Sequence, residues 1–128
     1  MKQQQQRSYI KSGLYNRALH ADILGSLFPQ FTGCFWLRYS RHAMREALDD
    51  KFGPVLHPPR RICIGPEHIV EITVEDSVAM KAVVRLPLDD RRDLVLVLGQ
   101  PQDTGECKVI TLWTNRKSDN HATLKLNS

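Results

Sequence analysis

The residues best suited to chemistry stand near the end of the chain, in the stretch WTNRKSDNHATLKL. Its second half alternates the polar residues His121, Thr123 and Lys125 with three apolar ones. A β-strand with this alternation places its polar side chains on one face and its apolar side chains in the core. With the strand that we predict just before it, the expected polar patch consists of Thr111, Trp113, His121, Thr123 and Lys125.

This patch suits RNA cleavage without a metal ion. In that reaction a 2′-hydroxyl attacks the neighbouring phosphate, so an enzyme must remove one proton, supply another to the leaving 5′-oxygen and stabilise the added negative charge. His121 could transfer protons because the reference pKa of histidine lies near neutrality, and Trp113 could stack on a base. The negative charge could be held by Arg85, Arg116, Lys117 or Lys125. The alternative is an ordinary exposed strand face, in which a single histidine has no function.

A second candidate group surrounds His42 in the stretch SRHAMREAL. Ser40 is a favourable N-cap, and a helix that begins after it directs its N-terminal amide groups toward any bound phosphate. Arg41 and Arg45 lie on the flanks of this helix and could bind the same phosphate. His42, however, projects about 160 degrees away from Met44, the centre of the expected apolar stripe. A solvent-exposed histidine without a catalytic role is therefore the alternative.

Two helices would precede the strands that carry these residues. Apolar residues at helical spacing predict a first helix over 13–28, ended by Pro29, and a second over 41–52, ended by Gly53 and Pro54. The buried stripe of the second helix is expected to be Ala43, Met44, Ala47, Leu48 and Phe52. A short apolar connection is expected between the two helices.

After a proline-rich loop over 54–66, the apolar period changes to two. The alternation in HIVEITVED indicates a half-buried strand with one solvent-facing side, at or near a sheet edge, whereas the apolar run DLVLVLG indicates a central strand. The predicted strands cover 68–76, 78–86, 93–99 and 107–114, with a possible fifth at 121–126 after a polar turn at 115–120. No helix separates them, which predicts an α+β fold with two N-terminal helices packed on a four- to five-stranded antiparallel sheet.

Length and charge narrow the class of protein further. The 128 residues suit one domain, which we place at 13–128 after a flexible, basic, glutamine-rich tail at 1–12. The formal net charge is +4 and both ends of the chain are cationic, which favours RNA or another polyanion as a partner. A charged surface that only keeps the protein in solution is the alternative. No run of about 18 apolar residues and no signal-peptide core occurs, which predicts a cytoplasmic protein that does not enter a membrane.

The three cysteines, Cys34, Cys63 and Cys107, include no CxxC pair. We therefore expect reduced and mostly buried thiols rather than a disulfide framework or a zinc site. The histidines form no metal-ligand pattern either, so the sequence predicts neither a metal ion nor a cofactor.

The order of these pieces resembles the small toxin-type ribonuclease domains of the barnase, EndoU, colicin E and RelE group. The resemblance covers residues 40–126 and rests on SRHAMREAL, VVRLPLDDRRDLVLVL, KVITLWTN and DNHATL. It implies one or two N-terminal helices before a four-stranded antiparallel sheet, and a metal-independent endoribonuclease that acts on RNA as a toxin or effector. The positions that it implies to be functional are His42, Arg45, Thr111, Asn115, His121 and Thr123.

The sequence thus predicts one candidate site, with two possible functions. The predicted catalytic residues are His121, His42, Thr123 and Thr111, and the predicted substrate-binding residues are Arg45, Arg41, Trp113, Asn115, Arg116, Lys117, Lys125 and Arg85. The alternative function is that of a non-catalytic, small basic protein that inhibits a host protein or a nucleic-acid machine. The salt dependence of the binding affinity distinguishes the two kinds of partner. Affinity for phosphates falls steeply as the salt concentration rises, whereas affinity from apolar contact with a protein does not.

Overall fold

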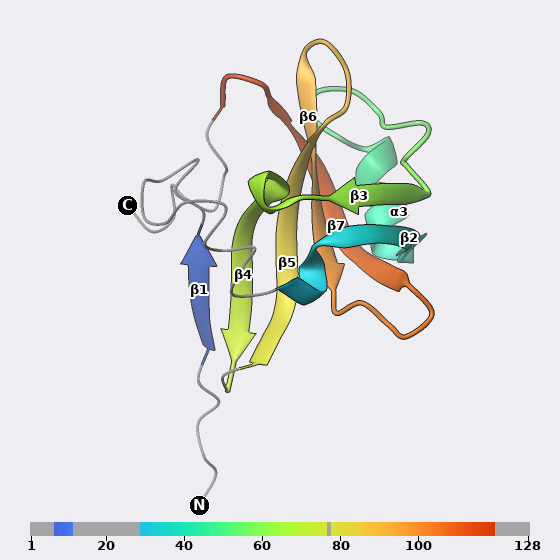
Figure 1. Ribbon diagram of the computed structural model, residues 1–128. Helices are drawn as coiled ribbons and strands as arrows, with labels where there is room; N and C mark the ends of the chain where they lie inside the picture. The colour runs from blue at the N-terminus through green and yellow to red at the C-terminus, as the bar shows by residue number, and fades with distance from the viewer. Residues whose placement is uncertain (1–6, 12–28, 77, 120–128) are drawn as a thin grey trace, which may run out of the picture.

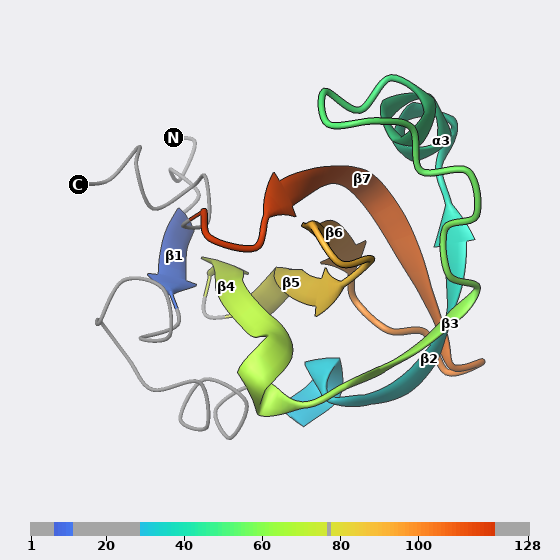
Figure 2. The ribbon, with the colours of Figure 1, turned by 90° about the horizontal axis from the view of Figure 1, so that it is seen from above.

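The computed structural model describes residues 7–11, 29–76 and 78–119 of the chain. Their strands form one seven-stranded sheet in the order β1-β4-β5-β6-β7-β2-β3 (Figure 1). The sheet is strongly curled, as Figure 2 shows from above. The strands are β1 (Arg7–Lys11), β2 (Gly33–Tyr39), β3 (Arg61–Ile64), β4 (Ile69–Glu75), β5 (Val78–Pro87), β6 (Arg92–Gly99) and β7 (Glu106–Arg116). The described helices are the α-helix α3 (Arg41–Leu48) and the 3-10 helices η1 (Pro29–Phe31) and η2 (Pro66–His68).

Strands β4 to β7 form an antiparallel meander in which each strand pairs with the next along the chain. The predictions of strands over 68–76, 78–86, 93–99 and 107–114 are confirmed by β4, β5, β6 and β7. The apolar run of β6 belongs to a central strand, as predicted. β4 is the second strand from one edge, because β1 pairs with its outer side, so the prediction of a position at or near an edge is confirmed.

The apolar core lies on one side of this meander. β6 contributes Leu94, Leu96 and Leu98 to it, all of them buried. α3 contributes Ala43 and Ala47 from the helix that packs against β7. Burial of one leucine side chain stabilises the fold by about 1.5–3 kcal/mol, so the leucines of β6 contribute strongly to this side of the sheet.

α3 begins where the sequence predicts and ends earlier. The Ser40 hydroxyl caps it by accepting a hydrogen bond from the Ala43 N–H (3.0 Å). The Asp50 carboxylate accepts hydrogen bonds from the N–H groups of Phe52 (3.0 Å) and Thr114 (2.8 Å). These bonds turn the chain toward β7, so the prediction of a helix that continues to residue 52 is wrong.

The apolar stripe of α3 is narrower than predicted. Ala43 and Ala47 are completely buried, whereas Met44 and Leu48 are 42% and 59% exposed. The two small alanine side chains make the contact with the core and leave the larger side chains outside it. Within the described ranges, no helix is long and apolar enough to cross a membrane.

The predicted fold class, two N-terminal helices on a four- to five-stranded antiparallel sheet, is wrong. The sheet is mixed, because β2 runs parallel to β7, with Trp36 opposite Glu106. α3, the one α-helix in the described ranges, follows two strands instead of preceding the sheet. The predicted helix at 13–28 and the possible strand at 121–126 lie outside the described residues.

The sequence pattern predicts a connection where β2 lies and a loop where β3 lies. Each of these strands pairs with a partner distant in the sequence: β2 pairs with β7 and, across α3 and the proline-rich loop, with β3. No hairpin turn marks either pairing, so local sequence signals do not reveal them.

The structure also corrects the prediction for two of the three cysteines. Cys34 of β2 and Cys63 of β3 lie directly opposite one another, with their Cα atoms 3.9 Å apart, and form a disulfide. A spacing of 29 residues says nothing about which strands pair, so the bond is not predictable from the spacing. Cys107 is free and buried, as predicted.

Candidate functional site

The side of the meander that faces away from the core is polar, and we call it the polar face. Alternation along β6 defines it, because Leu94 and Leu96 enter the core and the residues between and beside them point the other way. The register then places Arg85, Val95 and Trp113 side by side on β5, β6 and β7. The polar residues of this face are Glu71, Thr73, Lys81, Arg85, Asp93, Thr111, Trp113 and Asn115.

A β-bulge decides which residues of β7 reach the polar face. The pairing of β6 with β7 shifts between Val97 and Leu98, whose partners are Thr111 and Val109. Simple alternation predicts that Val109, Thr111 and Trp113 share a face, and this prediction is wrong for Val109. Val109 belongs to the core, and Thr111 and Trp113 lie on the polar face because the extra residue reverses the alternation.

Arg85 is held by the protein itself. Its side chain is 1% exposed, and its Nε lies 2.8 Å from Asp93 Oδ2. Its terminal nitrogens donate hydrogen bonds to the carbonyl oxygens of Asp119 (2.7 Å) and Arg116 (2.9 Å). Arg85 therefore positions the segment that follows β7, rather than binding phosphate as the sequence predicts.

Asn115, which the resemblance implies to be functional, lies beside Asp93 in the register of β6 and β7. It is 4% exposed, and its Nδ2 makes no hydrogen bond within the described part of the chain. A buried donor without an acceptor costs about 1–3 kcal/mol. The neighbouring Trp113 and Thr111 are half-buried, so they form the accessible part of this face.

Four residues of the polar face were not among the predicted site residues: Lys81 of β5, Asp93 of β6, and Glu71 and Thr73 of β4. Glu71 and Thr73 are 4% and 8% exposed, although the alternation of HIVEITVED predicts that they face solvent. Glu71 lies in one row with Val83, Val97 and Thr111 across the four strands. Alternation of polar and apolar residues shows that a strand has a polar and an apolar face. It does not show whether other parts of the protein cover the polar face.

The predicted residues of α3 lie away from the polar face. His42, Arg41 and Arg45 are all exposed, and His42 Nε2 lies 3.8 Å from Glu46 Oε1. α3 packs on the core side of β7, whereas Trp113 and Asn115 lie on its other side. The described structure therefore does not bring His42 together with Trp113. The outward projection of His42 predicted from helical angles agrees with its exposure.

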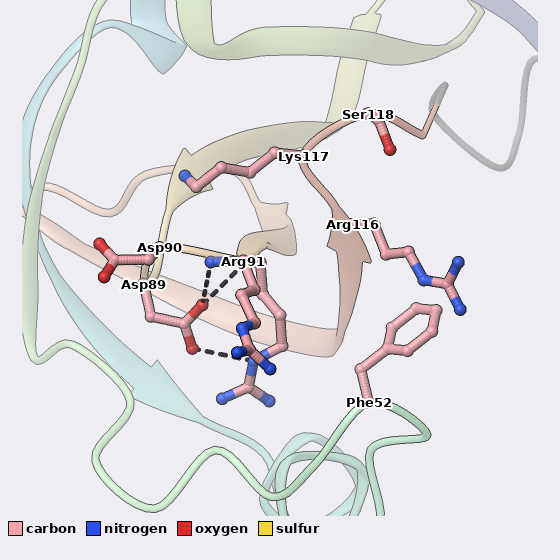
Figure 3. A pocket seen from close by; sticks show the side chains of 8 residues that line it. Phe52, Asp89, Asp90, Arg91, Arg116, Lys117 and Ser118 are labelled. Carbon is pink, nitrogen blue, oxygen red and sulfur yellow. Dashed lines mark hydrogen bonds and ion pairs between the residues drawn. The ribbon is translucent and has the colours of Figure 1, made fainter.

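The predicted phosphate-binding residues Arg116 and Lys117 line a pocket at the end of β7, with a volume of about 720 Å³ (Figure 3). Phe52, from the turn after α3, forms another part of its wall. The Arg116 guanidinium carbon lies 5.1 Å from the centre of the Phe52 ring. Lys117 Nζ lies 3.1 Å from Asp93 Oδ1 and so links the pocket to the polar face.

The turn between β5 and β6 completes the pocket. Asp89 organises this turn, since its Oδ1 accepts hydrogen bonds from the N–H groups of Arg91 (2.9 Å) and Arg92 (2.8 Å). The bond from the Arg91 N–H is the main cause that lowers the pKa of Asp89 below its usual value. The Asp89 carboxylate is thus ionised and already used by the turn, so it is not a free acid–base group.

No group of three or more histidine, cysteine or acidic side chains within the described ranges is arranged to hold a metal ion. Cys107 is a poor candidate for a nucleophile, because burial raises the pKa of its thiol to about 11. Burial also raises the pKa of Tyr39, whose hydroxyl donates a hydrogen bond to the Pro59 carbonyl.

Three predicted site residues, His121, Thr123 and Lys125, lie outside the described residues. The structure therefore groups Arg85, Thr111, Trp113 and Asn115 on the polar face, and Arg116 and Lys117 at the adjoining pocket. Comparisons of the chain with protein-family models, with curated proteins and with solved structures found no match, so they neither support nor oppose the resemblance to toxin-type ribonucleases.

Proposed function

We propose that the protein is a metal-independent endoribonuclease, a toxin or effector that cleaves single-stranded RNA at the polar face. The observation that carries the proposal is the buried Asn115 amide, whose Nδ2 makes no hydrogen bond within the described ranges, beside the half-buried Trp113 and Thr111. An aromatic plane next to a buried donor suits a base stacked beside a phosphate that gains negative charge.

In the proposed reaction, the 2′-oxygen forms a bond to the adjacent phosphorus while the bond from phosphorus to the 5′-oxygen breaks. The 2′-hydroxyl proton passes to a general base, and a general acid protonates the leaving 5′-oxygen. The products are a 2′,3′-cyclic phosphate and a 5′-hydroxyl, and the reaction needs no oxidant, reductant or metal ion. We assign the proton transfer to His121, with Thr123 as a hydrogen-bonding partner of the phosphate.

In this proposal Arg85 is a positioning residue. It holds the carbonyl groups of Arg116 and Asp119 against the sheet, and Asp119 lies two positions before His121 in the sequence. Trp113 stacks on a base, and Asn115 donates a hydrogen bond to the charged phosphate oxygens. His42, Arg41 and Arg45 are exposed on α3, on the other side of β7 from Trp113, and we assign them no catalytic role.

The test is cleavage of a labelled single-stranded RNA by the purified protein in EDTA. We expect the wild-type protein to cleave, and His121→Ala to lower the rate by at least about 100-fold, the scale of general acid–base catalysis. His57→Ala is the matched control, because His57 is an exposed histidine of the proline-rich loop. Asn115→Leu should lower the rate by about 100-fold, as the loss of one oxyanion donor does.

Equal cleavage by wild-type protein and by the His121→Ala variant would remove the proposed site. A wild-type protein that binds RNA without cleaving it would favour the alternative, a non-catalytic binding protein that inhibits a nucleic-acid machine. Circular dichroism of each variant separates loss of chemistry from loss of fold.

The Cys34–Cys63 disulfide bears on where such an effector would be made and where it would act. Disulfides form and persist in oxidising compartments and are rare in the reducing cytosol. We infer that the protein passes through an oxidising compartment before it acts on RNA in a cytoplasm. The disulfide-bonded form is therefore the one to assay first.

A further inference from the structure

The pocket at the end of β7 carries more positive charge than its carboxylates can balance. Arg91, Arg92, Arg116 and Lys117 line it together with two acidic residues, Asp89 and Asp90. Figure 3 shows the side chains of Asp89, Arg91, Arg116 and Lys117 around the pocket, with Phe52 next to Arg116. A volume of about 720 Å³ lies in the range of small-ligand sites.

Two of the four cations are already engaged. Arg92 Nε lies 2.9 Å from Asp89 Oδ2, and its terminal nitrogen donates a hydrogen bond to the Gly53 carbonyl (2.6 Å). Lys117 Nζ lies 3.1 Å from Asp93 Oδ1. In the described part of the chain, Arg91 and Arg116 form no ion pair, so their guanidinium groups are available to an anionic ligand.

The wall of the pocket is built to hold Arg116 in place. Its guanidinium group stacks against Phe52, and the Asp50 carboxylate fixes the turn that carries Phe52 by accepting its N–H and that of Thr114. A planar guanidinium held on a ring keeps its edge free for two hydrogen bonds to a phosphate, and little side-chain entropy remains to be lost on binding. Gly53, with φ of +121°, allows the sharp turn beneath it.

The pocket adjoins the polar face at Lys117, whose Nζ reaches Asp93. The Arg116 side chain lies on the other side of β7 from Asn115, toward Phe52. An extended chain of phosphates that leaves the polar face beside Asp93 would therefore enter the pocket past Lys117. A stacked base at Trp113 requires an unpaired strand, which excludes a regular duplex at this position.

We propose that this pocket binds consecutive backbone phosphates of a single-stranded RNA, with Arg91 and Arg116 as the principal phosphate ligands. The inference rests on the proposed ribonuclease function and adds a substrate-binding subsite beside the polar face. Phosphate binding by two arginines explains why they have no carboxylate partner among the described residues, whereas Arg92 and Lys117 have one.

The test is fluorescence anisotropy with a short, labelled, single-stranded RNA that carries 2′-O-methyl groups throughout, so that the proposed cleavage cannot consume it. The Arg91→Gln/Arg116→Gln double variant removes the two available guanidinium groups and keeps side-chain bulk. The matched control is Arg60→Gln/Lys108→Gln, which removes the same charge from two exposed positions outside the pocket.

We expect the pocket variant to bind at least 10-fold more weakly than wild type, and the control to change less than 2-fold. The slope of log affinity against log salt should fall by about 1.4 in the pocket variant, because each phosphate of a single strand that the protein no longer neutralises lowers it by about 0.7. Equal weakening in the two double variants, or wild-type affinity in the pocket variant, would overturn the inference. Absence of RNA binding by the wild-type protein would overturn it as well.

The same proteins, assayed on unmodified RNA in EDTA, separate this inference from the proposed function. A pocket variant that binds the modified RNA like wild type, while wild type still cleaves, refutes the subsite and leaves the ribonuclease standing. Wild-type protein that binds through the pocket and cleaves no RNA refutes the ribonuclease and leaves the subsite standing.

Discussion

Arg85 is the residue that most clearly connects the sheet to the candidate chemistry. A buried charge is costly unless its partners satisfy it, and here Asp93 and the carbonyl groups of Arg116 and Asp119 do so. The sequence predicts a phosphate-binding role because Arg85 is one of the cations that could hold the negative charge of the reaction. The structure instead gives it a positioning role, since its donors are used by the chain segment that follows β7.

Arg85→Ala should therefore destabilise the protein strongly. The substitution leaves the half-buried Asp93 with Lys117 as its one charged partner among the described residues, and it frees the carbonyl groups that Arg85 holds. We expect a loss of about 3–5 kcal/mol in the free energy of unfolding, measured by urea denaturation. Arg38→Ala, at an exposed position of β2, is the control and should change it by less than about 0.5 kcal/mol. A similar small change for Arg85→Ala would refute the positioning role.

The raised pKa of the Cys107 thiol predicts that the stability of the protein changes with pH in the alkaline range. Burial raises the pKa of its thiol to about 11 in the folded protein, against an ordinary value of 9.0. The neutral thiol is thus favoured by the fold, so its contribution is fully present below pH 9 and is lost as the pH rises from about 9 to 11. The free energy of unfolding should fall more steeply over this window in wild type than in Cys107→Ala. Parallel pH profiles for the two proteins would contradict the assignment.

The elements of the fold differ in how far their own sequence specifies them. β5, β6 and β7 are predictable because each is a short, largely apolar segment, continuous in β6, and short polar turns join them. β2 and β3 are not, because their pairing depends on partners distant in sequence. α3 lies between these cases: the Ser40 cap marks its start, but the Asp50 contacts that end it depend on β7.

The Cys34–Cys63 disulfide joins β2 to β3 and should stabilise the folded protein. Cross-linking residues 29 positions apart removes chain entropy from the unfolded state worth about 3–4 kcal/mol. Cys34→Ser/Cys63→Ser should lower the free energy of unfolding by about that amount. RNA cleavage at a temperature where the variant stays folded should be unchanged, because neither cysteine lies on the polar face or in the pocket. A variant as stable as wild type would show that the bond does not constrain the chain.

At the scale of the whole molecule, the curled sheet separates an apolar core from a polar face and places a cationic pocket at the end of β7. The sequence correctly groups Thr111 and Trp113, because residues two apart share a strand face. It does not reveal that a bulge moves Val109 into the core or that Glu71 and Thr73 are covered. It also suggests a shared site for His42 and Trp113, which the packing of α3 on the core side of β7 does not provide.

The central claim is that this molecule cleaves RNA through its 2′-hydroxyl without a metal ion, and mass spectrometry of the digestion products in EDTA tests it most directly. We predict fragments that end in a 2′,3′-cyclic phosphate and begin with a 5′-hydroxyl, and no cleavage of the same sequence with 2′-O-methyl groups. Intact RNA, fragments with 5′-phosphates, or cleavage that appears only when Mg²⁺ is added would contradict the account.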